Sequence, residues 1–188
     1  MLSGVVIAGG RSSRMGEDKA LMPFGSYSSL AQLQYRKLQK IFNRVYISTK
    51  SNKFDFDANL IYDKYNNISP LNAIISSLEE TNSDIFLLSV DIPLISKKTI
   101  DKLIDAYKKY PYYETIIAKS INGLEPTVAI YKQSVLNVAK QMQERQNFKL
   151  REFIKSTNYL TIPINSREEF LNINTKKDYK EAINLINF

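Results

Sequence analysis

The fold is decided by residues 4–19, which read GVVIAGGRSSRMGEDK. The first five are small or apolar residues of the kind that form a buried strand. Two adjacent glycines, Gly9 and Gly10, follow this run directly. Glycine lets the backbone turn sharply and bring its amide N–H groups close to a phosphate. The stretch therefore predicts a strand, Gly4–Ala8, that ends in a phosphate-binding turn.

Basic residues follow the turn. Arg11, Arg14 and Lys19 can neutralise a polyphosphate, the arginines through a planar fork and the lysine as a point charge. The stretch is not a P-loop, because Gly10 and Gly16 are six residues apart and an acidic residue follows the second. Nor is it a dinucleotide fingerprint, because the first two glycines are adjacent. A plain glycine-rich turn with solvated arginines is the alternative interpretation of these features.

Beyond residue 19, short apolar runs alternate with segments of helical period, a pattern typical of βα units and a mostly parallel sheet. Ser69, Ser96 and Thr175 suit the N-caps of three helices, and two more helices are expected near Leu30–Phe42 and Gln133–Gln143. The expected strands are Gly4–Ala8, Val45–Thr49, Leu60–Tyr62, Ile85–Val90, Thr115–Lys119, Thr127–Tyr131 and Tyr159–Pro163. We predict a three-layer α/β/α, Rossmann-like open sheet, in which ligands bind at the carboxyl ends of the strands.

The 188 residues include neither cysteine nor histidine. Disulfides and thiolate metal sites are therefore excluded, as are the usual zinc sites and every catalytic triad that depends on histidine. Any bound metal has to be held by oxygen ligands, which favours Mg²⁺, Ca²⁺ or Mn²⁺.

The composition predicts a folded protein of the cytoplasm. Apolar residues make up 44% and charged residues 24%, which argues against disorder, and the length suits one domain over residues 1–188. No apolar run approaches the roughly 20 residues of a membrane span, and no signal peptide is visible, so we expect no membrane partner. The net charge of +7 permits anionic ligands. Lys and Arg are scattered without a basic block, so we expect no nucleic-acid partner.

Two carboxylates follow expected strands. Asp91 comes after Ile85–Val90, and a carboxylate at the end of a central strand can hold Mg²⁺ against a triphosphate. A turn residue before a proline is the alternative for Asp91. Asp63 ends the shorter strand Leu60–Tyr62.

The segment from Ile7 to Lys19 resembles the signature of the molybdenum cofactor guanylyltransferase family. In that family a Leu-Ala-Gly-Gly turn leads through a short basic stretch into Arg-Met-Gly and an Asp-Lys pair, and only Ile7 departs from it here. The resemblance implies a fold like that of the nucleotide-diphospho-sugar transferases. It also implies that Ile7, Ala8, Gly9 and Gly10 receive the guanine nucleotide, and that Lys19 and Arg14 contact its phosphates.

The resemblance extends along the chain. It implies that Asp91 binds the metal and that Asp63 touches the nucleotide, although the following loop, Ser69–Ala73, lacks both glycines of the family. Glu125 stands where the family has the histidine of a His-Pro-Thr segment near the acceptor. Residues 172–175 match an Asn-x-Asn-Thr sequence. Asn172 or Asn174 could complete the Mg²⁺ shell, and the alternative is that Asn174 or Thr175 simply caps the last helix. The nucleotide-binding half is expected over about residues 1–95 and the acceptor-binding half over about 96–188.

The reaction implied by the resemblance is transfer of GMP from GTP to a molybdopterin-type phosphorylated acceptor, which releases pyrophosphate and forms the guanine dinucleotide cofactor. The attacking phosphate oxygen is already anionic, so no general base is needed. Lys19, Arg14 and Asp91 would be the catalytic residues, acting by charge stabilisation and through Mg²⁺. Transient contacts with cofactor-delivery proteins are also expected.

Two other functions fit the same residues. One is a sister nucleotidyltransferase, either a cytidylyltransferase or an enzyme that acts on a sugar or polyol phosphate or a cobalamin precursor. Gly9 favours guanine, because related cytidylyltransferases usually have Ala-Ala-Gly at the turn. The other is a non-catalytic nucleotide-binding regulator, against which the intact Lys19 and Asp91 argue.

Overall fold

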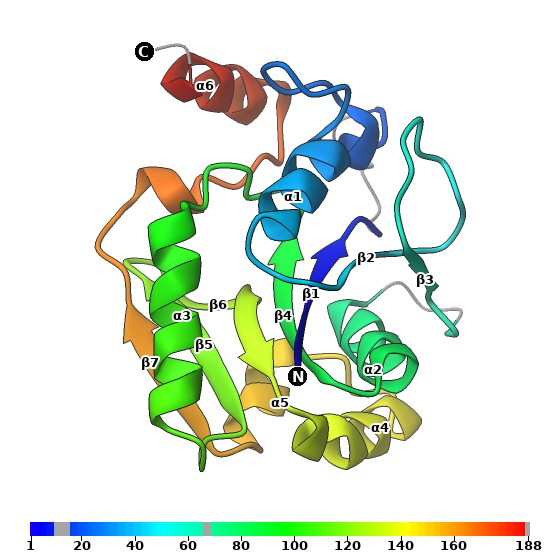
Figure 1. Cartoon of the computed structure of the whole chain (residues 1–188), viewed down its shortest axis with the longest axis vertical. Coiled ribbons are helices and arrows are strands. Elements are labelled where there is room, and N and C mark those ends of the chain that lie inside the picture. Colours follow the sequence, from blue (N-terminus) through cyan, green and yellow to red (C-terminus); the bar gives the residue numbers. More distant parts are fainter. Residues whose placement is uncertain (10–15, 66–68, 187–188) are drawn as a thin grey trace.

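A computed structural model describes residues 1–9, 16–65 and 69–186 (Figure 1). Its centre is a seven-stranded sheet in the order β3-β2-β1-β4-β6-β5-β7. The strands are β1 (Leu2–Ile7), β2 (Val45–Thr49), β3 (Leu60–Tyr62), β4 (Asp84–Ser89), β5 (Thr115–Ser120), β6 (Gly123–Tyr131) and β7 (Tyr159–Pro163). All sheet pairings are parallel except those of β6 with β4 and β5. The predicted open and mostly parallel sheet is confirmed.

Helices cover both faces of this sheet (Figure 1). They are α1 (Leu30–Gln39), α2 (Pro70–Thr81), α3 (Lys97–Lys109), α4 (Leu136–Glu144), α5 (Leu150–Lys155) and α6 (Lys176–Ile186), with 3-10 turns η1 (Lys19–Leu21), η2 (Gln133–Val135) and η3 (Glu168–Phe170). Apolar side chains of α1, α3 and α6 join one core cluster, and those of α2, α4 and α5 join the other. The alternation of strand side chains between two faces produces these clusters: Val6 of β1 belongs to the first and Val5 to the second.

The predicted helix starts are confirmed. The Ser69 side chain accepts a hydrogen bond from the Leu71 amide, and the Ser96 side chain accepts one from the Thr99 amide. Thr175 and Asp178 each accept from the other's backbone N–H, which is a capping box at the start of α6. These caps satisfy amides that the first helical turn leaves unpaired.

Two predictions about the second half of the chain were incomplete. The strand expected at Thr127–Tyr131 begins four residues earlier, at Gly123, and forms an antiparallel hairpin with β5. Gly123 has a φ of +115°, which a residue with a Cβ rarely adopts. The helix α5 was not predicted, because six residues are too few to show a helical period.

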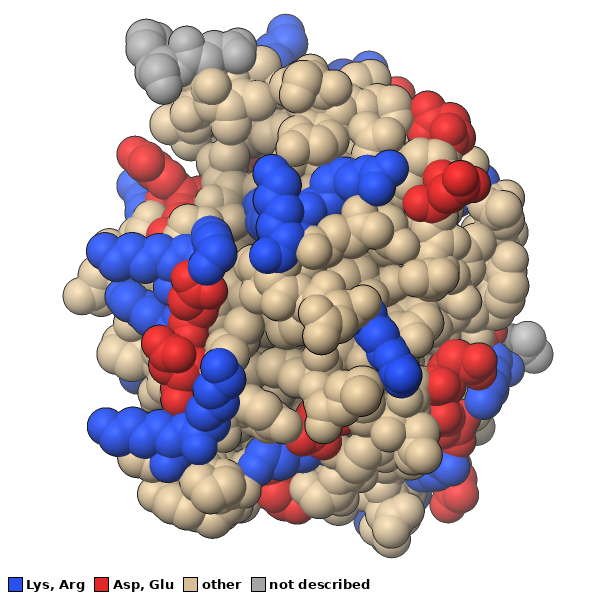
Figure 2. Space-filling model, in the orientation of Figure 1, with Lys and Arg blue, Asp and Glu red and all other residues tan. Residues whose placement is uncertain are grey.

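Two surface properties follow from these elements. Within the described part of the chain, none of the helices has the length and apolar character required to cross a bilayer. On the face drawn in Figure 2, basic and acidic side chains alternate along α3, where Lys97 and Asp101 form an i,i+4 ion pair. Such mixed charge is typical of a solvated helix face.

Candidate active site

The carboxyl ends of β1, β2 and β4 meet at one edge of the sheet. Ile7 of β1 lies beside Ser48 of β2 and Ser89 of β4. The Ala8 amide donates to the Ser48 carbonyl over 3.0 Å, and the Val90 amide donates to the Ile7 carbonyl over 3.1 Å. Ile7 and Ala8 are buried at this edge.

Gly9 and Asp63 are neighbours at this edge. A Cβ placed on Gly9 would lie 3.5 Å from Asp63 Oδ2. Asp63 Oδ1 accepts a hydrogen bond of 2.7 Å from the Ser48 hydroxyl. Burial raises the pKa of Asp63, while the Ser48 hydrogen bond and the nearby Lys50 charge oppose that rise. Ser48, to which sequence patterns assign no role, thus orients the carboxylate beside the glycine turn.

Lys19 joins three segments that are far apart in the sequence. Its Nζ atom lies 3.5 Å from Asp91 Oδ2 and donates hydrogen bonds to the Ile173 carbonyl over 2.7 Å and to Asn174 Oδ1 over 3.2 Å. The Asp18 side chain positions Lys19, because it caps the 3-10 turn η1 by accepting from the Ala20 amide. The structure therefore brings the predicted Lys19 and Asp91 together.

Asp91 is fixed from two directions. Its Oδ1 atom accepts a hydrogen bond from the Ser89 hydroxyl, and its carbonyl accepts from the Ile173 amide over 2.8 Å. The Asp91 side chain is 25% exposed and that of Lys19 is 15% exposed. The pair is thus partly shielded from water, which strengthens the attraction between its two charges.

The donors near Asp91 suit a hard cation. Within the described ranges, no group of three or more His, Cys, Asp or Glu side chains is placed to hold a metal ion. Asp91 and the Asn174 amide oxygen both approach Lys19, and both are oxygen donors. Mg²⁺ commonly takes only one or two protein carboxylates and completes its shell with water and substrate phosphates. These residues therefore fit Mg²⁺ bound together with a nucleotide.

Of the two asparagines considered for this site, Asn174 contacts Lys19 through its side-chain oxygen. The alternative, that residues 174 and 175 only cap the last helix, is half correct. Thr175 and Asp178 form the capping box, and the Asn174 backbone amide donates to Asp178 over 2.9 Å. The Asn174 side-chain oxygen instead accepts a hydrogen bond from Lys19. One short segment thus both starts α6 and contributes to the site.

Lys53 is a site residue that sequence reasoning missed. Its Nζ atom donates to the Ala8 carbonyl over 3.1 Å and forms an ion pair with Asp18. It therefore links the residue before the Gly9 turn to the residue before Lys19. Lys53 lies in the loop between β2 and β3, and no local pattern distinguishes it from the other surface lysines.

We expect Lys53→Met to raise the KM for the nucleotide about tenfold, equivalent to about 1.4 kcal/mol. In this variant the Ala8 carbonyl and the Asp18 carboxylate, which lie on either side of most of the predicted phosphate-binding residues, lose their shared partner. No predicted catalytic group is removed. Steady-state kinetics and nucleotide titration measure the effect. Lys97→Met is the matched control, because its partner Asp101 is solvent-exposed and such pairs contribute little. Equal KM values in the two variants would contradict the anchoring role.

Glu125 was expected near the acceptor. Its Oε1 atom accepts a 2.5 Å hydrogen bond from Ser120, and burial raises its pKa. Because Val128 of β6 pairs with Leu88 of β4, Glu125 lies beyond the end of β4, at the same edge as Asp91. Gly10 and Arg14, two further predicted site residues, lie outside the described residues.

Gly9, Lys19 and Asp91, gathered at the carboxyl edge of an open α/β sheet, form the kind of site at which such folds bind nucleotides. Residues 4–161 match the family model described as the MobA-like NTP transferase domain. The chain belongs to this family.

Individual relatives agree with this assignment. A Helicobacter pylori protein named molybdenum cofactor guanylyltransferase is 34% identical, over 97% of this chain and 92% of that protein. A Campylobacter jejuni protein of the same name is 31% identical, over 96% and 94%. The solved structure of a molybdopterin-guanine dinucleotide biosynthesis protein A from Archaeoglobus fulgidus superposes with a TM-score of 0.84 at 18% identity, covering 98% of both chains. This structural likeness shows a shared nucleotidyltransferase fold.

Proposed function

We propose that the chain transfers GMP from GTP to a molybdopterin-type acceptor, releasing pyrophosphate and forming the guanine dinucleotide cofactor. The meeting of Lys19, Asp91 and Asn174 at the carboxyl edge of the sheet, where β1 also ends, carries this proposal. Two relatives, 34% and 31% identical over nearly the whole chain, bear the name of this activity and support the choice of base and acceptor.

The reaction needs a charged and well-ordered site more than a proton acceptor. An anionic oxygen of the acceptor's terminal phosphate forms a bond to the α-phosphorus of GTP. The bond from that phosphorus to the bridging oxygen breaks, and pyrophosphate leaves with the electron pair. Positioning and electrostatic stabilisation provide the catalysis in such transfers. A site without a histidine or cysteine base is adequate for this chemistry.

Each residue has a role in this proposal. Lys19 neutralises the charge that develops on the α-phosphoryl group and the leaving pyrophosphate, and Arg14 assists it. Asp91 and Asn174 hold Mg²⁺, which when bound supplies positive charge to the triphosphate. The nucleotide contacts Ile7, Ala8, Gly9 and Gly10 and lies near Asp63.

The acceptor is proposed to bind on the side of Glu125, within the half of the chain from about residue 96 to residue 188. Residues 173 and 174 of this half reach Lys19, so both halves of one domain over residues 1–188 would build the catalytic centre. Transient contacts with cofactor-delivery proteins and a cytoplasmic location complete the proposal.

Pyrophosphate release, measured with each NTP in the presence and absence of molybdopterin, tests the proposal. We expect release with GTP that depends on molybdopterin, and tighter binding of GTP than of CTP or ATP in calorimetric titrations. CTP that binds and reacts at least as well as GTP would move the chain to the cytidylyl branch. Binding of GTP without turnover, under conditions where a known guanylyltransferase turns over, would identify a nucleotide-binding regulator.

A further inference from the structure

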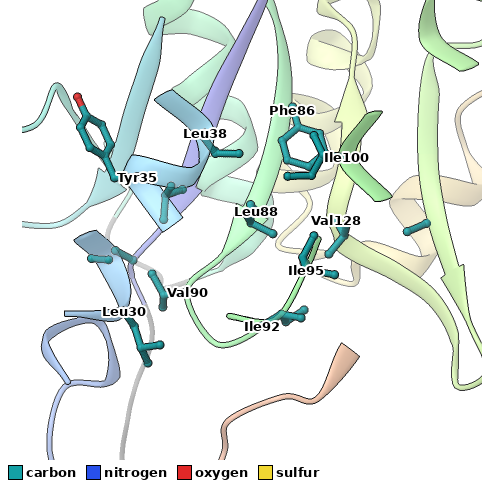
Figure 3. Packing of buried hydrophobic residues seen from close by; sticks show 14 of the residues in the cluster. Leu30, Tyr35, Leu38, Phe86, Leu88, Val90, Ile92, Ile95, Ile100 and Val128 are labelled. Atoms are coloured by element: carbon teal, nitrogen blue, oxygen red, sulfur yellow. The ribbon is translucent and has the colours of Figure 1, made fainter. Parts of the chain in front are cut away.

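The loop that carries Asp91 is buried against α1. This loop, residues 89–95, connects the end of β4 to the N-cap of α3. Val90, Ile92 and Ile95 are at most 7% exposed, and they belong to the same apolar cluster as the inward face of α1 (Figure 3). These apolar contacts hold the loop in place as a whole. Its buried peptide groups still need hydrogen-bond partners within the core.

Two polar side chains of α1 supply those partners. Gln34 Nε2 donates to the Ser89 carbonyl over 3.1 Å and to the Ile92 carbonyl over 2.8 Å, one on each side of Asp91. Lys37 Nζ donates to the carbonyls of residues 93 and 95, over 2.7 and 2.8 Å. Gln34 and Lys37 are three residues apart, so they project from the same face of the helix.

Both side chains occupy positions where a polar group is costly. Gln34 is fully buried, and among the described residues its Oε1 atom has no hydrogen-bond partner. Turning the amide over would place that oxygen against two carbonyl oxygens, so the two N–H donors fix its orientation. Burial lowers the pKa of Lys37 to about 8, and the negative charge of Glu169 opposes this shift. A buried polar atom left unpaired calls for an explanation.

We propose that Gln34 and Lys37 are positioning residues that hold the 89–95 loop so that the Asp91 carboxylate faces Lys19. The inference rests on the proposed function, because it concerns the geometry of the same site. In the contacts described above, both side chains donate to loop carbonyls rather than to Lys19 or Asp91. Gln34 orients the peptide groups that follow residues 89 and 92, one on each side of Asp91, and Lys37 orients those that follow residues 93 and 95. Without them, the loop would keep its apolar contacts, and the direction of the carboxylate would become less well defined.

Amide hydrogen exchange of the ligand-free protein tests the first part of the proposal. We expect the peptide spanning residues 89–96 to exchange about tenfold faster in Gln34→Leu and in Lys37→Met than in the wild type. The matched controls are Gln39→Leu and Lys40→Met, which change the same residue types near the exposed end of α1. If Gln34→Leu does not fold, Gln34→Asn keeps an amide that is too short to reach both carbonyls. Equal exchange in the variants and their controls would overturn the proposal.

The dependence of activity on Mg²⁺ tests the second part. In Gln34→Leu, the Mg²⁺ concentration for half-maximal activity should rise about tenfold, while the Kd for GTP without metal stays unchanged. Leu38→Ala lowers the stability of the same helix by removing a buried side chain that donates nothing to the loop. A similar Mg²⁺ shift in Leu38→Ala would reduce the effect to general destabilisation and overturn the positioning role. An inactive wild-type protein would contradict the proposed function instead, and the exchange comparison would still decide the role of Gln34 and Lys37.

Discussion

Lys19→Ala is expected to lower turnover by at least about a hundredfold in a protein that still folds. The Lys19 ammonium is the cation at the point where the Asp91 carboxylate, the Ile173 carbonyl and the Asn174 amide oxygen converge. A lost charge contact to a transferring phosphoryl group commonly costs about 2.7–4 kcal/mol of transition-state stabilisation. Pyrophosphate release under saturating GTP measures this loss, and circular dichroism checks the fold.

Two further variants make the Lys19 test specific. Lys19→Arg retains the charge but replaces a compact ammonium with a planar fork, so we expect it to recover only part of the activity. Lys97→Ala removes an exposed lysine from a surface pair and should leave turnover unchanged. Near-normal kcat/KM in folded Lys19→Ala would remove the residue from the catalytic role and weaken the assignment of the site.

The fold was predictable where short apolar runs mark strands and helical periods mark helices. The strands Val45–Thr49, Leu60–Tyr62 and Tyr159–Pro163 have the boundaries that the apolar runs predicted. The first half of β6 was not predictable in this way. Its residues are only partly buried, and it contains Pro126, which usually argues against a strand interior. It became a strand through pairing with β5, which is a tertiary effect.

The site residues were predictable only where they belong to a local sequence motif. Lys19 and Asp91 were found from ordered local patterns, and the structure places their charged groups 3.5 Å apart. Lys53 and Gln34 had no such pattern, because their partners lie 35 to 58 residues away in the sequence. Gln34 even breaks the expected apolar face of its helix. A polar residue on the buried face of a predicted helix therefore indicates a buried hydrogen-bond partner. The partner itself can only be identified from the three-dimensional structure.

Asp91→Asn distinguishes a metal ligand from a turn residue. Asparagine keeps the shape of the side chain, so the Ser89 hydroxyl can still donate to its Oδ1 atom and the Ile173 amide can still donate to the residue 91 carbonyl. The fold should therefore survive. The variant removes the negative charge that a divalent cation needs, and among the described residues Asp91 belongs to no group of three or more metal-binding side chains that could make up for the loss.

We therefore expect Asp91→Asn to lose most Mg²⁺-dependent activity, about a hundredfold or more at the Mg²⁺ concentration that saturates the wild type. GTP binding without metal should be unchanged or tighter, because a carboxylate beside the phosphates repels them. Activity measured against Mg²⁺ concentration separates the two roles, with Asp101→Asn as a control, since Asp101 lies on the solvated face of α3. A turn residue would be replaced well by asparagine. Superimposable Mg²⁺ curves for wild type and Asp91→Asn would leave Asp91 a structural residue, and the metal ligand would have to be sought elsewhere in the chain.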